Sequence, residues 1–313
     1  LYTMGKVRHG VAGNPVSHSL SPVLTAIVHA HLARTSGVNL PGLKGVVVIP
    51  TDGVENALAW GYAGGLPSPP DWELVGSPLG KFRANALLER AVNVAMEHEE
   101  ADPRLPNSPL PVTEFESHRY HDDEVWLSLT SPLKHQLSTA AVKCVDNAME
   151  IRSVNTMRWD GRTWSAASTD GPGMIMVAKA FGFDEKSVIG ITGGGGAARS
   201  VAAAWSQNGG TVKQVGGNRL LEEDGPWNLS KKKENFLVDF ENDSGDIHVR
   251  YGSMSGGFDE RIELLSKKID GRWLLCAQHL HSWSRLWAPE YSHHLPSLSL
   301  LMTRLVAVEV QLK

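Results

Sequence analysis

A run of four glycines after an apolar segment constrains the fold of this chain more than any other feature. The run lies in VIGITGGGGAAR, which extends from Val188 to Arg199. The apolar VIGI predicts a buried parallel strand, because a strand covered on both faces is apolar at successive positions. Gly193, Gly195 and Ala198 fit the G-x-G-x-x-A pattern of dinucleotide-binding turns, in which small residues permit a tight turn, a close pyrophosphate and helix packing.

The segment after the glycines predicts a helix from Ala197 to about Gln207. Such a helix would direct its free N–H groups at the phosphates of a dinucleotide. We therefore predict a cofactor site that also includes Gly194, Gly196 and Ala197. The alternative is a tight strand-to-helix connection without a ligand, which glycine-rich turns also form.

The turn after the next strand bears on the choice of dinucleotide. Residues 211–215 predict that strand, and Gly217, Asn218 and Arg219 follow it. NAD-binding domains usually carry an acid at the end of this strand, whereas an arginine there suits the additional phosphate of NADP. Because the acid is missing, no carboxylate is expected to compete for the ribose hydroxyls. We therefore predict that Asn218 and Arg219 help to bind NADP.

Length, charge and cysteine usage exclude several classes of protein. A chain of 313 residues is long enough for about two domains. Its net charge of -4, without a basic stripe, gives no reason to expect nucleic acid as a partner. The two cysteines, Cys144 and Cys276, lie far apart and have no metal-ligating neighbours in the sequence, so we expect a reduced cytoplasmic protein without a metal. No apolar run reaches the roughly 18 to 20 residues of a membrane span and no leader pattern is found, so no membrane association is expected.

The N-terminal segment combines a strand, a turn and a helix start. Residues 6–11 predict a strand that ends at a turn containing Gly13. Ser21 followed by Pro22 predicts a helix N-cap with proline in the first turn. The serines have two interpretations: they cap the helix, or Ser19 and Ser21 present hydroxyls beside a positive helix end to a substrate carboxylate.

Apolar periodicity and turn residues place the remaining elements. Prolines on both sides of a helical pattern mark residues 61–121 as an insertion with its own helix. Asp160 and Gly161 predict a hairpin turn between two strands. Further strands are predicted at 45–49, 125–130, 151–159 and 163–167, and helices at 54–60, 81–100, 171–181, 259–268, 278–287 and 297–312.

Two charged residues lie where helices are predicted to begin. A helix is predicted from near Lys134, with Leu137 and Cys144 among its inward-facing residues. A lysine there is usually a solvated first-turn residue, although the helix dipole disfavours a cation at that end. Asp170 precedes the helix that ends at Gly182, and an acid at such a position is by default a structural cap.

Several stretches, taken in order, resemble motifs of the shikimate dehydrogenase family. GNPVSHSLSP, at 13–22, is similar to the family's G-x-P-[IV]-x-H-S-x-S-P, and LTSPLK, at 129–134, is similar to the segment that carries its catalytic lysine. TDGPG, at 169–173, resembles T-D-G-x-G, which carries the catalytic aspartate. Shorter resemblances are SVNT at 153–156 to A-x-N-T, GGGGAAR at 193–199 to G-A-G-G-A-x-R, Asn218 and Arg219 to the start of N-R-T, and Gln278 to the glutamine that opens the family's C-terminal helix.

The resemblance implies a fold and an activity. The implied fold is α/β, with an open α/β substrate domain and a Rossmann-like NADP-binding domain whose sheet is mainly parallel. The substrate domain is expected at 1–176, with the insertion at about 61–121 and completion by helices at 277–313, and the dinucleotide-binding domain at 177–276. The implied activity is the reversible reduction of 3-dehydroshikimate to shikimate with NADPH, on the pathway to chorismate and the aromatic amino acids, by a cytoplasmic monomer or homodimer.

The resemblance also implies roles for individual residues. Lys134 would transfer the proton at the reacting oxygen, with Asp170 as its catalytic partner. Ser19 and Ser21 would hold the substrate carboxylate. The residues implied to address the ring hydroxyls are Thr130, Asn155, Asp170 and Gln278, and Ser128, in place of the family's frequent asparagine, is expected to reach the substrate through water.

Other positions depart from the family pattern. Leu220 replaces the threonine of N-R-T, and Ser168 replaces a common asparagine. Two alternatives to the implied activity remain. A quinate/shikimate dehydrogenase of broader specificity is possible because Arg219 bears only on the cofactor, and a ligand-binding relative that has lost turnover is possible because the cofactor domain is expected to be trimmed. Retention of Lys134 and Asp170 weighs against the second.

The last part of the predicted cofactor domain is short. The segment 246–252 fits the family's D-x-[IV]-[IV]-N-A-T strand with Arg250 at the asparagine position, or a later strand with Tyr251 as its tyrosine. In either register one strand is expected to be absent. The cofactor domain is therefore expected to be trimmed.

Overall fold

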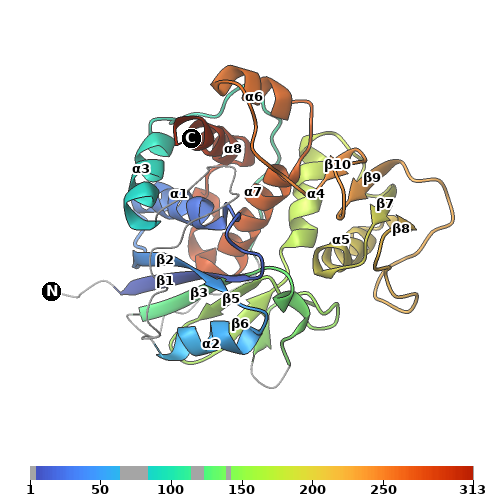
Figure 1. Cartoon of the computed structure of the whole chain (residues 1–313), viewed down its shortest axis with the longest axis horizontal. Coiled ribbons are helices and arrows are strands. Elements are labelled where there is room, and N and C mark those ends of the chain that lie inside the picture. Colours follow the sequence, from blue (N-terminus) through green and yellow to red (C-terminus); the bar gives the residue numbers. More distant parts are fainter. Residues whose placement is uncertain (1–4, 64–83, 114–122, 139–141, 313) are drawn as a thin grey trace.

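Two β-sheets organise the chain, one in its N-terminal half and one in residues 188–248 (Figure 1). The computed structural model describes residues 5–63, 84–113, 123–138 and 142–312. The strands of the first sheet are β1 (Lys6–Gly13), β2 (Gly42–Pro50), β3 (Asp123–Leu129), β4 (Lys143–Cys144), β5 (Thr156–Trp159) and β6 (Trp164–Ala167). The strands of the second sheet are β7 (Val188–Thr192), β8 (Thr211–Gly216), β9 (Phe236–Asp239) and β10 (Ile247–His248). The helices are α1 (Ser21–Ala33), α2 (Val54–Ala63), α3 (Ala84–Met96), α4 (Asp170–Ala180), α5 (Gly196–Gln207), α6 (Phe258–Leu265), α7 (Gly271–Ser282) and α8 (Leu298–Gln311), with shorter turns η1 (Leu133–His135), η2 (Trp283–Trp287) and η3 (Pro289–His294).

The first sheet is mixed, with the strand order β2-β1-β3-β5-β6-β4. β2, β1 and β3 run parallel, and β5 is antiparallel to both of its neighbours. The predicted hairpin between β5 and β6 is confirmed, with the Asp160 N–H donating to the Thr163 carbonyl at 3.3 Å. Because β1 and β3 are parallel, the loops that follow Gly13 and Leu129 leave the same edge of the sheet.

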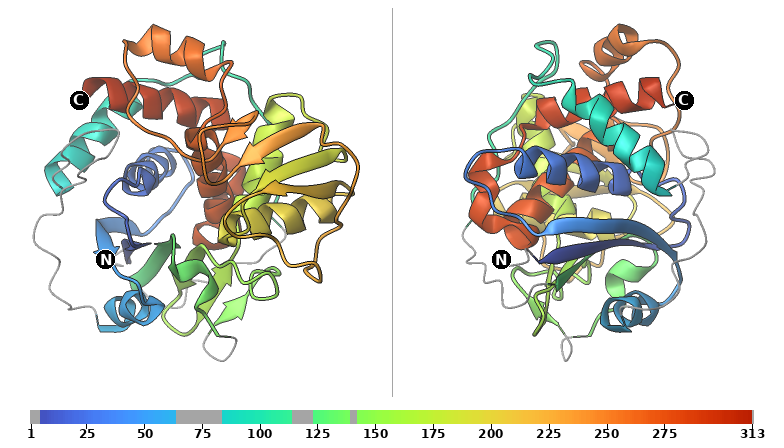
Figure 2. Two further views of the ribbon diagram at one scale, coloured as in Figure 1. Left: turned by 45° about the vertical axis from the view of Figure 1, so that its right-hand side comes forward. Right: turned by 90° about the vertical axis from the view of Figure 1, so that its left-hand side faces the viewer.

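Helices cover both faces of the first sheet. α1, α3 and α8 pack against one another on one face, and α2 contacts β1 on the other (Figure 2). Three tryptophans fill the core between the sheet and the C-terminal helices. Trp126 of β3 stacks on Trp287, with ring centroids 5.6 Å apart, and meets Trp283 edge-on at 5.0 Å.

The second sheet has the predicted parallel character, with four strands in the order β10-β9-β7-β8. The strand order reverses between β7 and β9, and ligands of open α/β sheets bind at such a switch point, beyond the carboxyl ends of the strands. The glycine loop follows β7 directly and so lies there. Residues 217–246 are all described and contain no helix, so β8 connects to β9, and β9 to β10, without one.

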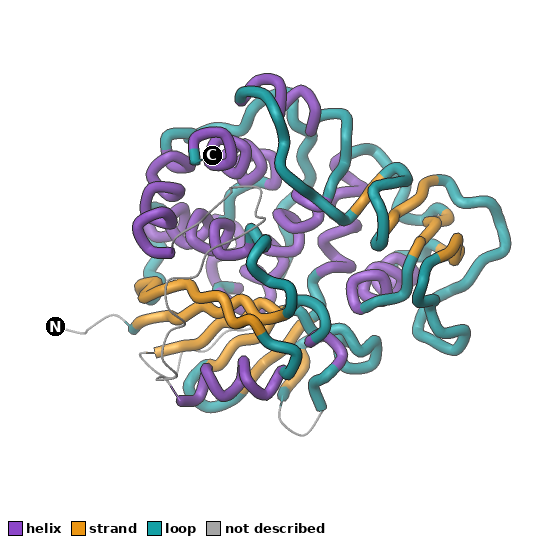
Figure 3. The backbone as a smooth tube through the Cα atoms, in the orientation of Figure 1, coloured by secondary structure: helices purple, strands orange, loops and turns teal. Residues whose placement is uncertain are grey.

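Helices α4 and α7 lie between the sheets. α4 packs against α5 and α7, and Figure 3 shows helices between the two groups of strands. Two glycines of α4 permit this packing. A Cβ atom on Gly171 would lie 2.2 Å from the Ser200 carbonyl oxygen, and one on Gly173 would lie 2.9 Å from the Gln278 nitrogen. The two glycines of the motif T-D-G-x-G therefore permit close helix packing.

The helix predicted from Lys134 is wrong. Only the three-residue 3₁₀ turn η1 forms there, and Cys144 lies in β4, paired with Ala166 of β6. Residues 139–141 lie outside the described part of the chain. The Gln136 side chain accepts a hydrogen bond from the Val54 N–H at 2.9 Å and donates to two backbone carbonyls. These tertiary bonds and the pairing with β6 outweigh local helix propensity.

Three other predicted boundaries are corrected by the structure. The strand predicted at 151–159 begins only at Thr156, because Arg152 adopts a left-handed backbone with φ of 50°. Gln278 lies inside α7 and does not open a helix, since the Asp270 side chain caps this helix by accepting from the Arg272 N–H at 2.9 Å. Ser21 is the first residue of α1, and the N-cap position belongs to Leu20.

The expectation that one late strand of the second sheet is absent is also wrong. The apolar segment FLVD forms β9, which sequence reasoning did not identify, and β10 pairs with it. Both late strands are therefore present, and Tyr251 follows the outer one. Within the described residues no helix combines the length and apolarity needed to cross a bilayer, and no group of three or more His, Cys, Asp or Glu side chains could hold a metal ion.

Candidate active site

A cavity of about 430 Å³ lies at the carboxyl edge of the first sheet, between the loops after β1 and β3 and helix α7. The loops after parallel strands converge there, so residues distant in sequence meet. All eight residues predicted to be catalytic or to bind substrate line this cavity: Ser19, Ser21, Ser128, Thr130, Lys134, Asn155, Asp170 and Gln278.

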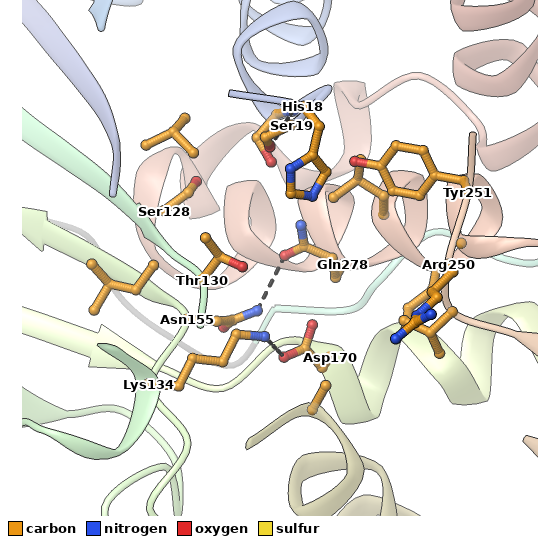
Figure 4. Close-up of a pocket in the computed structure, with 18 of the residues that line it drawn as sticks. His18, Ser19, Ser128, Thr130, Lys134, Asn155, Asp170, Arg250, Tyr251 and Gln278 are labelled. Atoms are coloured by element: carbon orange, nitrogen blue, oxygen red, sulfur yellow. Dashed lines mark hydrogen bonds and ion pairs between the residues drawn. The ribbon is translucent and has the colours of Figure 1, made fainter. Parts of the chain in front are cut away.

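Lys134 and Asp170 form the charged centre of the cavity (Figure 4). The Lys134 Nζ lies 2.6 Å from the Asp170 Oδ2, and the two side chains are 16% and 8% exposed. Asp170 is the first residue of α4, the N-cap position belongs to Thr169, and the Asp170 carboxylate pairs with Lys134. Lys134 lies on η1, whose backbone is held by a 2.8 Å hydrogen bond from the Val154 N–H to the Lys134 carbonyl. Its position therefore depends on tertiary contacts and not on a helix start.

A buried amide network forms the floor of the cavity. The Asn155 Nδ2 donates to the Gln278 Oε1 at 3.2 Å and to the Thr169 hydroxyl at 2.9 Å. The Thr169 hydroxyl also donates to the Gln278 Oε1, at 3.0 Å. The bonds from Asn155 and from Thr169 both go to the Gln278 oxygen. The Gln278 amide nitrogen is therefore left to donate into the cavity, as Figure 4 shows. Thr169 was not predicted as a site residue, although it lies in the T-D-G-x-G motif.

Hydroxyl groups line the end of the cavity near α1. The Ser19 Oγ accepts a 3.2 Å hydrogen bond from the Ser21 N–H in the first turn of α1, while the Ser19 hydroxyl hydrogen remains able to donate. The Tyr251 hydroxyl accepts from the Leu20 N–H at 3.4 Å, and burial raises the pKa of Tyr251 to about 12. Tyr251 therefore stays a neutral phenol with a proton to donate. The sequence indicated this residue through the second register of residues 246–252, in which Tyr251 is the tyrosine of a late strand.

Two further side chains bring nitrogen atoms to the cavity. His18 and Arg250 line it, and Figure 4 shows them on the side of Tyr251. Arg250 is exposed and adds a positive charge opposite Asp170. Neither was predicted as a site residue, although both occur in segments that were compared with family motifs.

A second cavity, of about 600 Å³, adjoins the first and shares Thr130, Lys134, Ala197 and Val249 with it. Most of the residues predicted to bind cofactor line this cavity: Gly193, Gly194, Gly195, Gly196, Ala197 and Arg219. Asn218 lies beside it. Gly193 has φ of 106°, and a Cβ on Gly194 would lie 2.4 Å from the Leu220 backbone. A larger residue would therefore be strained at Gly193 and would clash with the Leu220 backbone at Gly194.

The helix at the second cavity has an N-terminus suited to a phosphate group. Gly195 is the N-cap of α5, a twelve-residue helix with no acidic residue in its first turn, so its free N–H groups favour an anion. The Ser153 hydroxyl donates to the Gly196 carbonyl at 2.7 Å, and the buried Arg199 donates to the Ile151 carbonyl at 3.0 Å. These bonds hold the glycine loop against the segment that carries Asn155.

A carboxylate from another loop lies beside the turn that carries Arg219. Glu241, from the loop after β9, accepts from the Asn218 N–H at 2.8 Å and from the Asn218 side-chain amide at 3.0 Å. The sequence pattern did not indicate this contact, because Glu241 belongs to a different connection of the sheet.

No protein-family model and no curated protein matches the sequence. Solved structures are similar over nearly the whole chain. The shikimate 5-dehydrogenase of Thermus thermophilus, in complex with NADP(H) and shikimate, is similar over 96% of this chain and 99% of that one, with 19% identity and a TM-score of 0.55.

Two other solved structures agree. The shikimate dehydrogenase of Aquifex aeolicus matches 96% of this chain and 97% of its own, with 17% identity and a TM-score of 0.52. The Mycobacterium tuberculosis enzyme matches 96% of this chain and 98% of its own, with 15% identity and a TM-score of 0.51. This chain therefore has the fold of the shikimate dehydrogenases, an α/β substrate domain joined to a Rossmann-like domain.

Proposed function

We propose that this protein is an NADP-dependent shikimate dehydrogenase, which interconverts 3-dehydroshikimate and shikimate on the pathway to chorismate and the aromatic amino acids. One observation carries the proposal: the Lys134–Asp170 pair, 2.6 Å apart, lies where the hydroxyl-lined cavity meets the cavity of the glycine loop. This location supports a role for the pair in proton transfer between a polyol in the first cavity and a dinucleotide in the second.

The chemistry requires such a group. NADPH, when bound, supplies a hydride, and a reduced ketone oxygen must then gain a proton. Lys134 donates that proton from Nζ, and in the reverse direction it accepts the proton of the substrate hydroxyl. Asp170 holds the ammonium group in place and accepts a hydrogen bond from a neighbouring hydroxyl of the ring.

The remaining groups fit an anionic, hydroxylated ring. The hydroxyls of Ser19, Ser21 and Tyr251 lie together near α1 and can donate to a carboxylate. Hydrogen bonds to a charged acceptor are stronger than neutral ones. The amides of Asn155 and Gln278 are fixed by their mutual hydrogen bond and address the ring hydroxyls.

Domain organisation and location are part of the same proposal. The substrate domain comprises 1–176 with 277–313, and the dinucleotide-binding domain comprises 177–276. Cys144 and Cys276 are both free thiols, which suits a reducing compartment such as the cytoplasm.

The test is the absorbance of reduced nicotinamide after protein is mixed with shikimate and NADP. Parallel reactions contain quinate in place of shikimate and NAD in place of NADP. Oxidation of shikimate by the parent protein, and its loss in Lys134→Met, is the expected result. Oxidation of quinate at an equal or higher rate would favour the broader dehydrogenase. Calorimetric binding of shikimate without oxidation by either cofactor would instead favour a ligand-binding protein.

A further inference from the structure

The backbone of the loop after β8 donates hydrogen bonds to a carboxylate of another loop, that of Glu241 after β9. The carboxylate lies where an anionic ligand would bind. The Glu241 Oε2 and Oε1 atoms lie 2.8 and 3.0 Å from the Asn218 nitrogen, and Oε2 lies 3.0 Å from the Asn218 Nδ2. The Arg219 nitrogen is 3.5 Å from Oε1. Two successive backbone N–H groups and an amide thus converge on one carboxylate. Successive N–H groups of this kind form anion-binding concavities.

The position of Glu241 is fixed by its own loop. The buried Asp239 carboxylate accepts from the backbone N–H groups of Glu241 and Asn242, both at 2.9 Å. On its other side the Glu241 side chain lies against the glycine loop, since its Cγ would be 3.3 Å from a Cβ on Gly193. Glu241 therefore connects the glycine loop with the turn that carries Arg219, and both line the second cavity.

This turn is where a Rossmann-like domain distinguishes its cofactors. The residues after the second strand meet the adenosine ribose, which bears a 2′-hydroxyl in NAD and a 2′-phosphate in NADP. Arg219 offers a positive charge suited to the phosphate. Glu241 offers the opposite charge and already uses the backbone N–H groups that the phosphate would need. Two anions cannot share these donors without repulsion.

We propose that Glu241 is a specificity-determining residue that opposes the 2′-phosphate of NADP and accepts hydrogen bonds from the ribose hydroxyls of NAD. Arg219 and Glu241 then act in opposite directions, so the preference for NADP is lower than Arg219 alone would produce. The identity of the cofactor rests on the proposed function. The role of Glu241 rests on its contacts with Asn218.

The test is calorimetric binding of two probes, adenosine 2′,5′-bisphosphate and 5′-AMP, which requires no turnover. Glu241→Gln keeps the size of the side chain and one acceptor oxygen but removes the negative charge. We expect it to bind the bisphosphate about tenfold more tightly and 5′-AMP less tightly, because the ribose hydroxyls of 5′-AMP lose a charged acceptor. The matched control is Glu223→Gln, an exposed residue of the connection between β8 and β9, which changes the net charge equally. Glu241→Ala should move the bisphosphate affinity in the same direction.

The outcomes separate this inference from the proposed function. Equal affinity of the parent and Glu241→Gln for the bisphosphate overturns the inference while leaving the nucleotide site intact. An equal gain in Glu223→Gln also overturns it, because the effect is then one of net charge. If neither the parent nor Glu241→Gln binds either probe, the inference fails together with the nucleotide site. Shikimate oxidation can fail for other reasons, but it does not enter this comparison.

Discussion

The Nζ of Lys134 and the Oδ2 of Asp170 lie 2.6 Å apart, although 36 residues separate them in the sequence. Lys134 comes from a short turn after β3, and Asp170 begins α4. The pair is little exposed to solvent, with side-chain exposures of 16% and 8%. Each residue therefore sets the position of the other, and we expect them to act as one unit.

Removal of the lysine should abolish proton transfer while leaving the cavity intact. Lys134→Met is expected to lower kcat by roughly 10²- to 10⁴-fold, as for loss of a general acid or base. Asp170→Asn should also lower kcat, and the double variant should lose much less than the product of the two effects. Steady-state kinetics of the four proteins measure this, with Lys143→Met on the exposed edge strand as a control. Losses in log kcat that simply add would contradict the proposal.

The serines near α1 should contribute mainly to substrate binding. Ser19→Ala and Ser21→Ala each remove a hydroxyl that would bind a carboxylate, worth roughly 1.5 to 3 kcal/mol. We expect a raised KM for shikimate with nearly unchanged KM for NADP. Ser19→Ala should also lower thermal stability, because its oxygen accepts from the Ser21 N–H. Reduced stability with unaltered kinetics in both variants would favour a purely structural role.

Arg219 should favour NADP over NAD. Arg219→Ala is expected to lower kcat/KM for NADP more than for NAD, because it removes the charge that pairs with the 2′-phosphate. The measurement is the ratio of the two kcat/KM values in the parent and the variant. The same ratio in both proteins would show that this arginine does not recognise the phosphate.

Gly171 should be essential for the packing of α4 on α5. A Cβ there would lie 2.2 Å from the Ser200 carbonyl oxygen and 2.6 Å from the Ala204 Cβ. Gly171→Ala is therefore expected to destabilise the fold by about 1 to 3 kcal/mol through overpacking. Gly42→Ala is the control, since a Cβ at Gly42 meets nothing within 4 Å. Equal denaturant midpoints for the two variants would contradict the expected close approach.

Acid should destabilise the protein through the buried His279. Burial lowers the pKa of His279 to about 3, whereas an unfolded histidine titrates near 6.5. Between these values the unfolded state binds more protons, so stability falls as pH decreases below about 6.5. At pH 5 this histidine alone should cost about 2 kcal/mol.

The variant His279→Leu tests the pH effect. Neither ring nitrogen of His279 has a hydrogen-bond partner among the described residues, so the replacement should leave no new unpaired group. Unfolding free energies at pH 7 and pH 5 should differ less in the variant than in the parent. His293→Leu, at an exposed position, controls for a change of side chain. An unchanged pH dependence in His279→Leu would exclude this residue as the cause.

Short-range patterns determined much of the fold and of the site. The glycine loop between β7 and α5, the hairpin at Asp160 and Gly161 and the start of α1 near Pro22 were all predictable. In each case steric and hydrogen-bonding preferences of a few adjacent residues decide the conformation. The motif comparison likewise identified Lys134 and Asp170 as partners, although it could not show their separation.

Other features were decided by contacts between distant segments. Lys134 lies on a 3₁₀ turn because Gln136 bonds to the start of α2 and Cys144 pairs with β6. Strand β9 forms because its short apolar segment pairs in parallel with β7. Local periodicity does not predict this pairing.

The clearest example is Glu241. Nothing in its local sequence relates it to Asn218, 23 residues earlier, and only the parallel pairing of β7 with both β8 and β9 brings their loops together. The sequence by itself determined which chemical groups the chain carries and which turns they follow. The tertiary structure decided which of those groups meet, because loops at one edge of a sheet become neighbours through strand order and not through sequence.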